Sequence, residues 1–145
     1  MKDKVLRVEL ADQDAKMPVY AHMGDAGLDL FSPRKVLLKA GEKVIVDTKI
    51  KIDLPKKTVG LIWDKSSLGC VFGVKVLGGV FDQNYKGTYT IGLINLSKKD
   101  YQIEKGDKIC QLLIQPIVNV KVKLVDKISN DSPRGGKRFG SSGKK

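Results

Sequence analysis

Two aspartates lie close to glycines in segments where a carboxylate could do chemistry. Asp29 follows Gly27 at the start of a strand-like run, and Asp82 opens a turn-like segment, residues 82–87, between two strand-like runs. A carboxylate in such a place can take a proton from water or hold a water bound to a metal ion. The plain alternative for both is a turn-forming or solvated aspartate.

A cation and two hydroxyls indicate phosphate binding. Lys65 adds a full positive charge, and Ser66 and Ser67 open the best candidate for a short helix, residues 66–72. Unpaired backbone N–H groups and the positive end of the helix dipole attract phosphate there. Capping of the helix by either serine explains these residues equally well. Gln111 lies in an apolar run, where a buried amide needs hydrogen-bond partners. It could contact a ligand there, or it could be a core glutamine whose partners belong to the protein.

The C-terminal segment differs in kind from the rest of the chain. Residues 132–145 contain four glycines, three serines, five basic residues and a single aromatic residue, Phe139. Such a segment cannot bury enough surface to fold alone, so we expect a flexible tail. The lone phenylalanine within Gly and Ser residues argues against a purely inert end.

The elements that must position these residues are predicted by an apolar period of two. In residues 43–54 the even positions are mostly apolar and the odd positions mostly charged, which indicates one strand, or two in succession, with one buried face. Similar alternation occurs at Leu6, Val8 and Leu10, at Tyr89, Ile91 and Leu93, and at Val118, Val120, Val122 and Leu124. Many short strands without a sustained helical period predict a sandwich, jelly roll or barrel, formed by residues 1–131.

Composition narrows the class of protein. The 145 residues fit one domain, and the net charge of +11 indicates an anionic partner without choosing among nucleotide, nucleic acid and membrane.

Cys70 and Cys110 form no CxxC pair, which favours reduced thiols. The single histidine, His22, argues against Ser-His-Asp catalysis or a histidine-bound metal. Trp63 fits the core or an interface. No run approaches the ~20 apolar residues of a membrane span, so we expect a soluble, cytoplasmic protein.

Five segments together resemble the five motifs of the trimeric dUTPase (deoxyuridine 5'-triphosphate nucleotidohydrolase) family. They are residues 26–30 (AGLDL), 64–69 (DKSSLG), 79–87 (GVFDQNYKG), 106–112 (GDKICQL) and 134–143 (RGGKRFGSSG). Each segment alone is a weak signal. Five of them in the family's order, spread over nearly the whole chain, are hard to produce by chance.

The resemblance implies an enzyme of nucleotide metabolism that hydrolyses dUTP to dUMP and pyrophosphate and so supplies dUMP for thymidylate synthesis. It implies that Asp82 is the general base for the water that attacks the α-phosphorus, and that Gln111 contacts phosphate near this water. Asp29 would orient Mg²⁺ on the triphosphate through water. Phe139 would stack on the uracil face, and Tyr85 would pack against the deoxyribose. The implied substrate-binding residues are Lys65, Ser66, Ser67, Gly79, Val80, Asp82, Tyr85, Lys86, Gln111, Arg134, Phe139, Gly140 and Ser141.

The fold implied by the resemblance is a distorted jelly roll with one short helix that assembles as a homotrimer. In the family, one subunit supplies the first, second and fourth motifs, a neighbour supplies the hairpin of the third, and the remaining subunit lends its tail. Three positions depart from the pattern. Lys65 stands where arginine is usual, Asn84 where a second aspartate is common, and Arg138 where glycine usually precedes Phe139.

Three alternatives stay open. The nearest is a dCTP deaminase of the same superfamily, alone or as a bifunctional dCTP deaminase and dUTPase, although Tyr85 and the glycine-rich tail favour the triphosphatase. A basic nucleic-acid-binding β domain fits the charge but lacks an aromatic-rich strand face for stacking bases, so a nucleic-acid partner is not expected. The third is a trimer that binds dUTP without hydrolysing it, because of the three departures.

Overall fold

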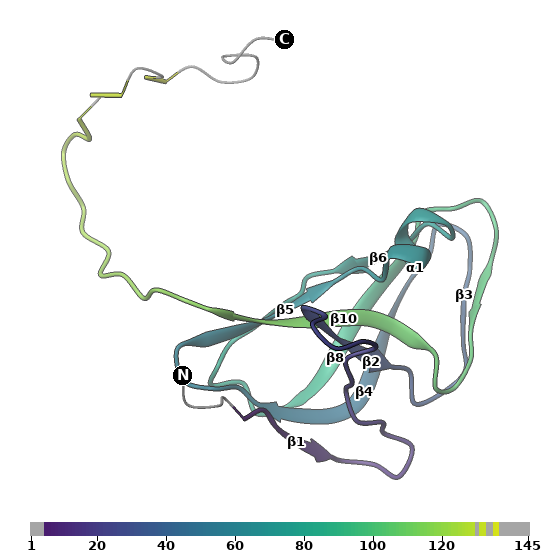
Figure 1. Ribbon diagram of the computed structural model, residues 1–145. Coiled ribbons are helices and arrows are strands. Elements are labelled where there is room, and N and C mark those ends of the chain that lie inside the picture. Colours follow the sequence, from purple (N-terminus) through teal and green to yellow (C-terminus); the bar gives the residue numbers. More distant parts are fainter. Residues whose placement is uncertain (1–4, 130, 133–134, 137–145) are drawn as a thin grey trace.

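The computed structural model describes residues 5–129, 131–132 and 135–136, which form strands and one short helix. Figure 1 shows the strands gathered into one body, from which the C-terminal part of the chain extends. The elements are β1 (Arg7–Leu10), β2 (Gly27–Phe31), β3 (Val36–Leu38), β4 (Lys43–Asp53), β5 (Thr58–Trp63), α1 (Ser66–Cys70), β6 (Val74–Leu77), β7 (Val80–Phe81), β8 (Thr88–Asn95), β9 (Tyr101–Ile103) and β10 (Lys108–Pro116). The predicted all-β class with one short helix is confirmed.

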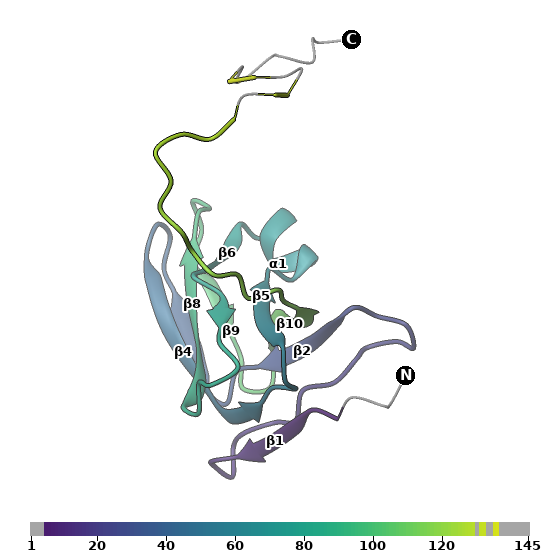
Figure 2. The same cartoon turned by 90° about the vertical axis from the view of Figure 1, so that its left-hand side faces the viewer.

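Two four-stranded sheets form the body. Their strand orders are β1-β4-β8-β6 and β2-β10-β5-β7, and β3 pairs with β9 in a separate ribbon. Figure 2 shows β4 and β8 on one side of the body and β5, β10 and β2 on the other. Buried side chains from both sheets make one hydrophobic cluster, built mainly from Leu, Ile and Val. The largest fully buried side chains are Tyr89, Leu30, Leu38, Ile50, Ile52, Ile91, Leu93, Ile103, Ile109, Leu112, Val46 and Val74.

β4 follows the alternation of its sequence. Its buried positions are Val46, Thr48, Ile50 and Ile52. The pairing with β8 shifts between Asp47 and Lys51, and Lys49 has a φ of 60° within this irregularity. The predicted one or two strands are therefore a single strand with a bulge, which keeps the buried face continuous on both sides of the shift.

Residues 117–129, which we call the C-terminal arm, do not form the strand that their alternation predicts. β10 ends at Pro116, and Ile117 still donates a backbone hydrogen bond to the carbonyl of Lys57 at 3.0 Å. Beyond it the arm runs away from the body (Figure 1) and pairs with no strand in the described part of the chain. Val122 is 90% exposed and Leu124 is 94% exposed. The strand prediction is wrong for the single chain because a strand needs a neighbouring strand for its backbone N–H and C=O groups.

Three smaller predictions are also decided by the structure. Cys70 is exposed, Cys110 is buried, and both are free thiols as expected. Trp63 is 58% exposed, so it does not belong to the core and only the interface alternative remains. Among the described residues, no helix is long and apolar enough to cross a membrane.

Candidate active site

A buried aspartate between two lysines lies at the centre of the site. Every residue of β2 is buried, and Asp29 in its middle is 1% exposed. Its Oδ1 lies 2.8 Å from Nζ of Lys65, and its Oδ2 lies 2.7 Å from Nζ of Lys108. Burial alone would raise the pKa of Asp29, but contacts with Lys108 and Lys65 outweigh it and hold the pKa below the usual value. The carboxylate is therefore ionised at neutral pH.

The two lysines come from different elements and carry more positive charge than Asp29 neutralises. Lys65 is the residue just before α1, and Lys108 begins β10 next to a shift in its pairing with β2. The side chain of Lys65 is 20% exposed and that of Lys108 is 41% exposed. Each ammonium has three donors and directs one at Asp29, so donors remain for an anionic ligand. The cluster is suited to phosphate.

Gln111 lies beside this cluster because of the strand register. It pairs with Asp29 on β2 and with Trp63 on β5, so the three side chains share one face of the sheet. Gly27 leaves room for the amide, since a Cβ at that position would lie 3.3 Å from Oε1 of Gln111. Gln111 is half-buried and not a core glutamine.

Helix α1 starts without the serine cap that the sequence predicts. Lys65 is the N-cap residue, and no side chain caps the helix. Ser66 and Ser67 lie in the first turn and are exposed, so the prediction that a serine caps the helix is wrong. Ser66 and Ser67 follow Lys65 in the chain, and phosphate binding by their hydroxyls stays a prediction.

Asp64 lies between β5 and α1, and its side chain binds this part of the chain to β6. Its Oδ1 accepts a hydrogen bond from the backbone N–H of Val76 at 2.7 Å, and its Oδ2 lies 2.6 Å from Nζ of Lys75. Burial opposes ionisation, but contacts with Lys75 and Val76 hold the pKa of Asp64 below its usual value. These contacts hold in place the backbone from which Lys65 reaches Asp29.

The predicted hairpin, residues 82–87, is a turn that joins β7 of one sheet to β8 of the other, and Asp82 lies at its entrance. β7 pairs with β5, and β8 pairs with β4 and β6, so these two strands do not pair with each other and the β-hairpin prediction is wrong. We keep the word hairpin for this turn between the sheets. Asp82 is exposed, and its carbonyl accepts a hydrogen bond from the N–H of Tyr85 at 3.0 Å. Gln83 anchors the turn to the next loop, because its Oε1 accepts the N–H of Lys57 at 2.8 Å. Gly79 and Val80 precede the turn, and Val80 is 69% exposed. The hairpin thus presents backbone and a free carboxylate at the surface.

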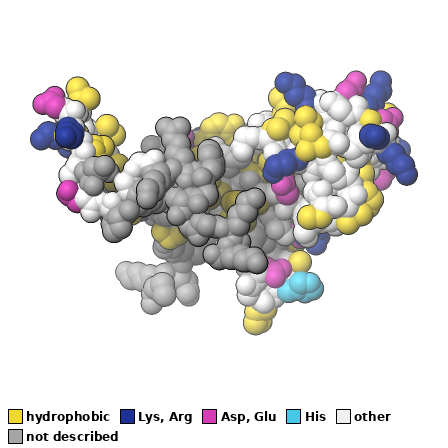
Figure 3. All heavy atoms as spheres, turned by 90° about the horizontal axis from the view of Figure 1, so that it is seen from above, with side chains coloured by type: hydrophobic (Ala, Val, Ile, Leu, Met, Phe, Trp, Pro, Cys, Tyr) yellow, Lys and Arg dark blue, Asp and Glu magenta, His cyan; other side chains and the backbone are white. Residues whose placement is uncertain are grey.

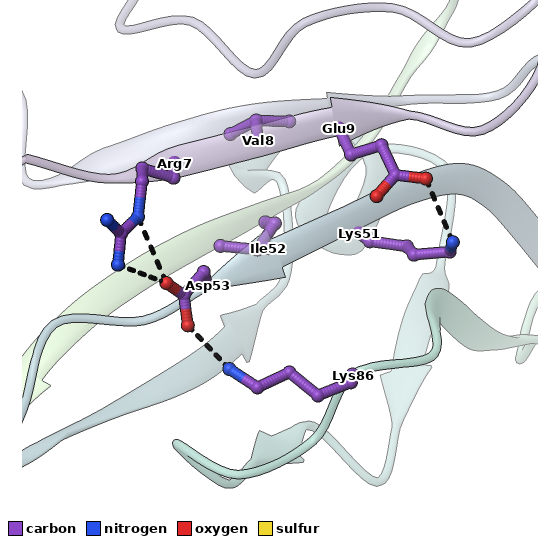
Figure 4. Close-up of a pocket in the computed structure, with 7 residues that line it drawn as sticks. All are labelled: Arg7, Val8, Glu9, Lys51, Ile52, Asp53 and Lys86. Atoms are coloured by element: carbon purple, nitrogen blue, oxygen red, sulfur yellow. Dashed lines mark hydrogen bonds and ion pairs between the residues drawn. The ribbon is translucent and has the colours of Figure 1, made fainter.

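Lys86 of the hairpin is engaged elsewhere in this structure. Figure 4 shows its ammonium directed at Asp53, which also binds the guanidinium of Arg7 at 2.6 Å. These side chains line a hollow of about 400 Å³ between β1, β4 and the hairpin. The contact with Lys86, followed by that with Arg7, lowers the pKa of Asp53. Substrate binding by Lys86 stays a prediction; its side chain is 63% exposed and its ammonium has donors besides the one directed at Asp53.

The lysine cluster and Asp82 lie far apart within one chain. Asp29, Gln111 and Trp63 share a row across the sheet, whereas Phe81 of β7 pairs with Gly60. Asp82 is therefore four residues from that row along the strands, roughly 13 Å, and three strands away, roughly 14 Å. Within one chain, Asp82 therefore does not reach the lysines.

The described residues provide no protein cage for a metal ion. No group of three or more His, Cys, Asp or Glu side chains that could hold a metal occurs among them. Both oxygens of Asp29 contact lysines, so it does not fit as a direct ligand in this arrangement. What fits is an ion held mainly by substrate phosphates and water, which is the usual manner of Mg²⁺.

Arg134, Phe139, Gly140 and Ser141, which the sequence assigns to substrate binding, lie outside the described residues. Arg138 lies there as well.

Comparison with known proteins decides the family. A model of the dUTPase family matches residues 13–143. The chain belongs to the dUTPase family.

Relatives and solved structures agree with this assignment. The chain is 42% identical over 146 residues to a deoxyuridine 5'-triphosphate nucleotidohydrolase of Clostridium tetani (strain Massachusetts / E88), covering 99% of this chain and 100% of that protein. It is 38% identical over 138 residues to the protein of the same name from Paramecium bursaria Chlorella virus 1, covering 95% and 97%.

Among solved structures, the G164S mutant of the Staphylococcus bacteriophage 80alpha dUTPase with dUpNHpp has a TM-score of 0.89 and 31% identity, covering 96% of this chain and 98% of that one. The D95N mutant of the phage phi11 dUTPase, described as revealing the coordination of a structural Mg(II) ion, has a TM-score of 0.79 and 28% identity, covering 85% and 97%.

Membership of the dUTPase family carries the activity. The chain is a dUTP diphosphatase, which hydrolyses dUTP to dUMP and pyrophosphate. The family, fold class and activity implied by the five motifs are confirmed.

Two residues of the candidate site, Lys108 and Asp64, were given no role from the sequence. Lys108 lies in the same segment as Gln111, but one more lysine carries no signal in a chain so rich in lysine. Asp64 begins the second of the five motif segments, but its role was not predicted, because its partners on β6 are known only from the fold.

Proposed function

We propose that the enzyme acts as a homotrimer in which each active site combines the lysine cluster of one subunit, the hairpin of a second and the tail of the third. The observation that carries this proposal is the separation of Asp82 from Asp29, Lys65 and Lys108 across the sheet β2-β10-β5-β7. A base and the phosphate that it serves must meet within hydrogen-bond reach. Two copies of the chain bring them together, whereas one does not.

The C-terminal arm supports the exchange of segments between subunits. Its apolar side chains alternate along an extended backbone and are exposed, as expected for a strand whose partner belongs to another chain. The arm leads toward residues 132–145 and away from its own body (Figure 1). From Pro116 to Phe139 an extended chain reaches at most about 80 Å, which is ample to reach a neighbouring site.

In the proposed reaction, water attacks the α-phosphorus of dUTP in line with the leaving pyrophosphate, and Asp82 accepts a proton from that water. Lys65 and Lys108 bind phosphate oxygens with the donors that Asp29 leaves free, and Ser66, Ser67 and Gln111 add hydrogen bonds. Mg²⁺ bound to the triphosphate would supply further positive charge as the pyrophosphate leaves. The positive charges and hydrogen-bond donors of the chain are thus positioned around the triphosphate before the reaction begins.

Substrate selection is proposed to come from the hairpin and the tail. Backbone groups of Gly79 and Val80 pair with the uracil edge, and Tyr85 packs against the deoxyribose. Phe139 covers the uracil, while Arg134, Gly140 and Ser141 close over the phosphates and exclude water. A site with these contacts favours dUTP over dTTP and UTP.

The surface charge does not favour the nucleic-acid alternative. Figure 3 shows Lys and Arg side chains spread over separate parts of the visible surface, with acidic and hydrophobic side chains among them. Several are paired with carboxylates, as Lys51 is with Glu9 and Lys75 with Asp64. A nucleic-acid partner would need a continuous basic stripe. We place the enzyme in the cytoplasm, where the free thiols Cys70 and Cys110 would stay reduced.

Mixing of two inactive variants tests the composite site. One variant carries Asp82→Asn, and the other lacks residues 134–145. Each should form trimers, measured by light scattering, with little hydrolysis. After subunits are exchanged, some sites combine an intact Asp82 from one chain with an intact tail from another, so pyrophosphate release should reappear.

A matched control mixes the truncated chain with a truncated chain that also carries Asp82→Asn, which can form no complete site. Absence of activity in the first mixture, with subunit exchange confirmed by mass, would exclude the composite arrangement. Full activity of the truncated chain alone would exclude a role for the tail.

A further inference from the structure

Tyr85 rests on two other aromatic rings at the base of the hairpin. The rings of Phe81 and Tyr89 are stacked, with centroids 4.0 Å apart and an interplanar angle of 9°. The ring of Tyr85 is tilted against both, with centroids 5.6 Å from Phe81 and 6.1 Å from Tyr89. Phe81 comes from β7 and Tyr89 from β8, so the stack joins the two strands that carry the turn.

The ring of Tyr85 is also held by its own turn. Its hydroxyl donates a hydrogen bond to the carbonyl of Thr88 at 2.9 Å. The ring folds back over Gly87, where an added Cβ would lie 2.5 Å from Oη and 2.7 Å from Cζ of Tyr85. Any larger residue at position 87 must push this ring away. Tyr85 is 39% exposed, so its remaining surface faces outward from the hairpin.

The polar part of Tyr89 takes no part in this arrangement. Tyr89 is 0% exposed, and its hydroxyl has no hydrogen-bond partner among the residues described. Burial, followed by the nearby Tyr85, raises the pKa of Tyr89 to about 12, so the group stays neutral. A buried hydroxyl without a partner is a cost to the fold, and the contribution of Tyr89 therefore comes from its ring.

We propose that Phe81 and Tyr89 are positioning residues that set the selectivity of the enzyme for deoxyribose over ribose, by fixing the ring of Tyr85. This inference rests on the proposed contact between Tyr85 and the sugar. Steric exclusion of a 2'-hydroxyl is effective only if the excluding group cannot move aside. A half-exposed tyrosine on a turn would otherwise change rotamer at little cost, and the stack below it removes that freedom.

The test compares kcat/KM for dUTP and UTP in the full-length enzyme. Phe81→Leu keeps an apolar side chain and removes the stack, while Gly87→Ala displaces the Tyr85 ring from the opposite side. Each should lower the ratio of kcat/KM for dUTP to that for UTP by at least about tenfold, mainly because UTP becomes a better substrate. Tyr89→Phe keeps the ring and should keep the ratio within about twofold of wild type.

Two controls separate positioning from general damage. Tyr101→Leu breaks an aromatic pair outside the hairpin, with Phe72 at 4.9 Å, and should leave the ratio unchanged. Tyr85→Ala should lower the ratio at least as much as Phe81→Leu. If Tyr85→Ala lowers it and neither Phe81→Leu nor Gly87→Ala does, the stack is only structural and the inference is wrong. If Tyr85→Ala leaves the ratio unchanged, the sugar contact itself is wrong and the inference falls with it.

Discussion

At the scale of single residues, Asp29 shows how one buried charge can organise two others. A carboxylate with 1% exposure would be costly to ionise alone, and the two lysines that come from α1 and β10 make its ionised form favourable. In return, Asp29 holds two ammonium groups on one side of the sheet, where their mutual repulsion would otherwise separate them. Both of its oxygens contact lysines, and a role toward Mg²⁺ through water stays a proposal.

Replacing Asp29 with asparagine therefore should damage both stability and activity. The two ammonium groups, which are partly exposed to solvent, lose their shared counter-charge. We expect the free energy of unfolding to fall by about 1–3 kcal/mol, because water screens the exposed lysines, and kcat/KM for dUTP to fall by at least about tenfold. Urea unfolding and steady-state kinetics measure the two effects. A variant with wild-type values for both would show that the lysines do not depend on Asp29.

The pH dependence of stability gives a second readout of the same carboxylate. Burial raises the pKa of Asp29, but the contacts with Lys108 and Lys65 lower it by more. The pKa in the folded protein therefore lies below the pKa in the unfolded chain. Its contribution to stability is then complete above about pH 4 and is lost as the pH falls through the folded pKa. The difference in unfolding free energy between wild type and Asp29→Asn should shrink on acidification below about pH 4, and a constant difference would contradict this.

Asp82→Asn separates chemistry from binding. The amide keeps the shape of the side chain but cannot accept the proton of the attacking water, so kcat should fall by at least about 100-fold. Binding of a non-hydrolysable dUTP analogue, measured by calorimetry, should persist. If more than about a tenth of wild-type turnover remains, the base lies elsewhere and Asp29 is the next candidate.

At the scale of elements, the shortest strand carries the hairpin. β7 has two residues, and just before it the carbonyl of Gly79 accepts a hydrogen bond from Ile62 of β5 at 2.8 Å. Gly79 has a φ of 113°, and a Cβ there would lie 2.9 Å from the carbonyl oxygen of Ile62. Gly78 also has a positive φ, 76°, but no atom lies within 4 Å of its Cβ position.

This pair of glycines offers a matched comparison. Gly79→Ala meets both backbone strain and a backbone clash, so we expect it to lower the free energy of unfolding by at least about 2 kcal/mol. Gly78→Ala meets only the unfavourable φ and should cost about 1 kcal/mol. Chemical unfolding measures both values. Equal losses would show that the close approach of β7 to β5 is not what requires glycine at position 79.

How far the sequence could predict these elements depends on where the information lies. The alternation of β4 and the turn residues 82–87 are local, and they predicted a strand and a turn correctly. The β-hairpin prediction failed because strand pairing is not local: β7 and β8 join different sheets. The pairing of Lys108 and Lys65 on Asp29 is set by the register of β2 and β10 and by the start of α1, which no local pattern encodes. The serine cap failed because an exposed first turn can be solvated without one. Apolar and polar residues alternate in the C-terminal arm as they do in a strand. This pattern cannot indicate that the body of the same chain offers no strand for the arm to pair with.

At the scale of the whole molecule, the exposed apolar side chains of the C-terminal arm are the surface that we propose contacts a neighbouring subunit. In a fully extended arm, Val120 and Val122 would lie on one side of the backbone and Lys121 and Lys123 on the other; both valines are exposed. The double variant Val120→Ser/Val122→Ser should weaken the trimer, because burial of each valine against a neighbour stabilises it by roughly 1.5 kcal/mol or more. Light scattering over a dilution series should reveal dissociation at higher concentrations than for wild type.

The matched control is Lys121→Ser/Lys123→Ser, which alters the opposite side of the arm and should leave the dissociation range nearly unchanged. Both variants should melt as isolated bodies at similar temperatures, because the arm contributes nothing to the core of its own chain. A stable trimer in the valine variant would show that the arm does not hold subunits together.

The position of the arm in the gene has a consequence for synthesis. A ribosome makes the chain from its amino end, and all ten strands of the described body precede residue 117. They have emerged and can pair with one another before the apolar arm is made. The same sequence at the amino end would be exposed beside unpaired strand edges while the body was still incomplete, a condition that promotes aggregation. Because the apolar arm is synthesised after the strands of the body, it is not exposed beside unpaired strands, and this order lowers the risk that the nascent enzyme aggregates.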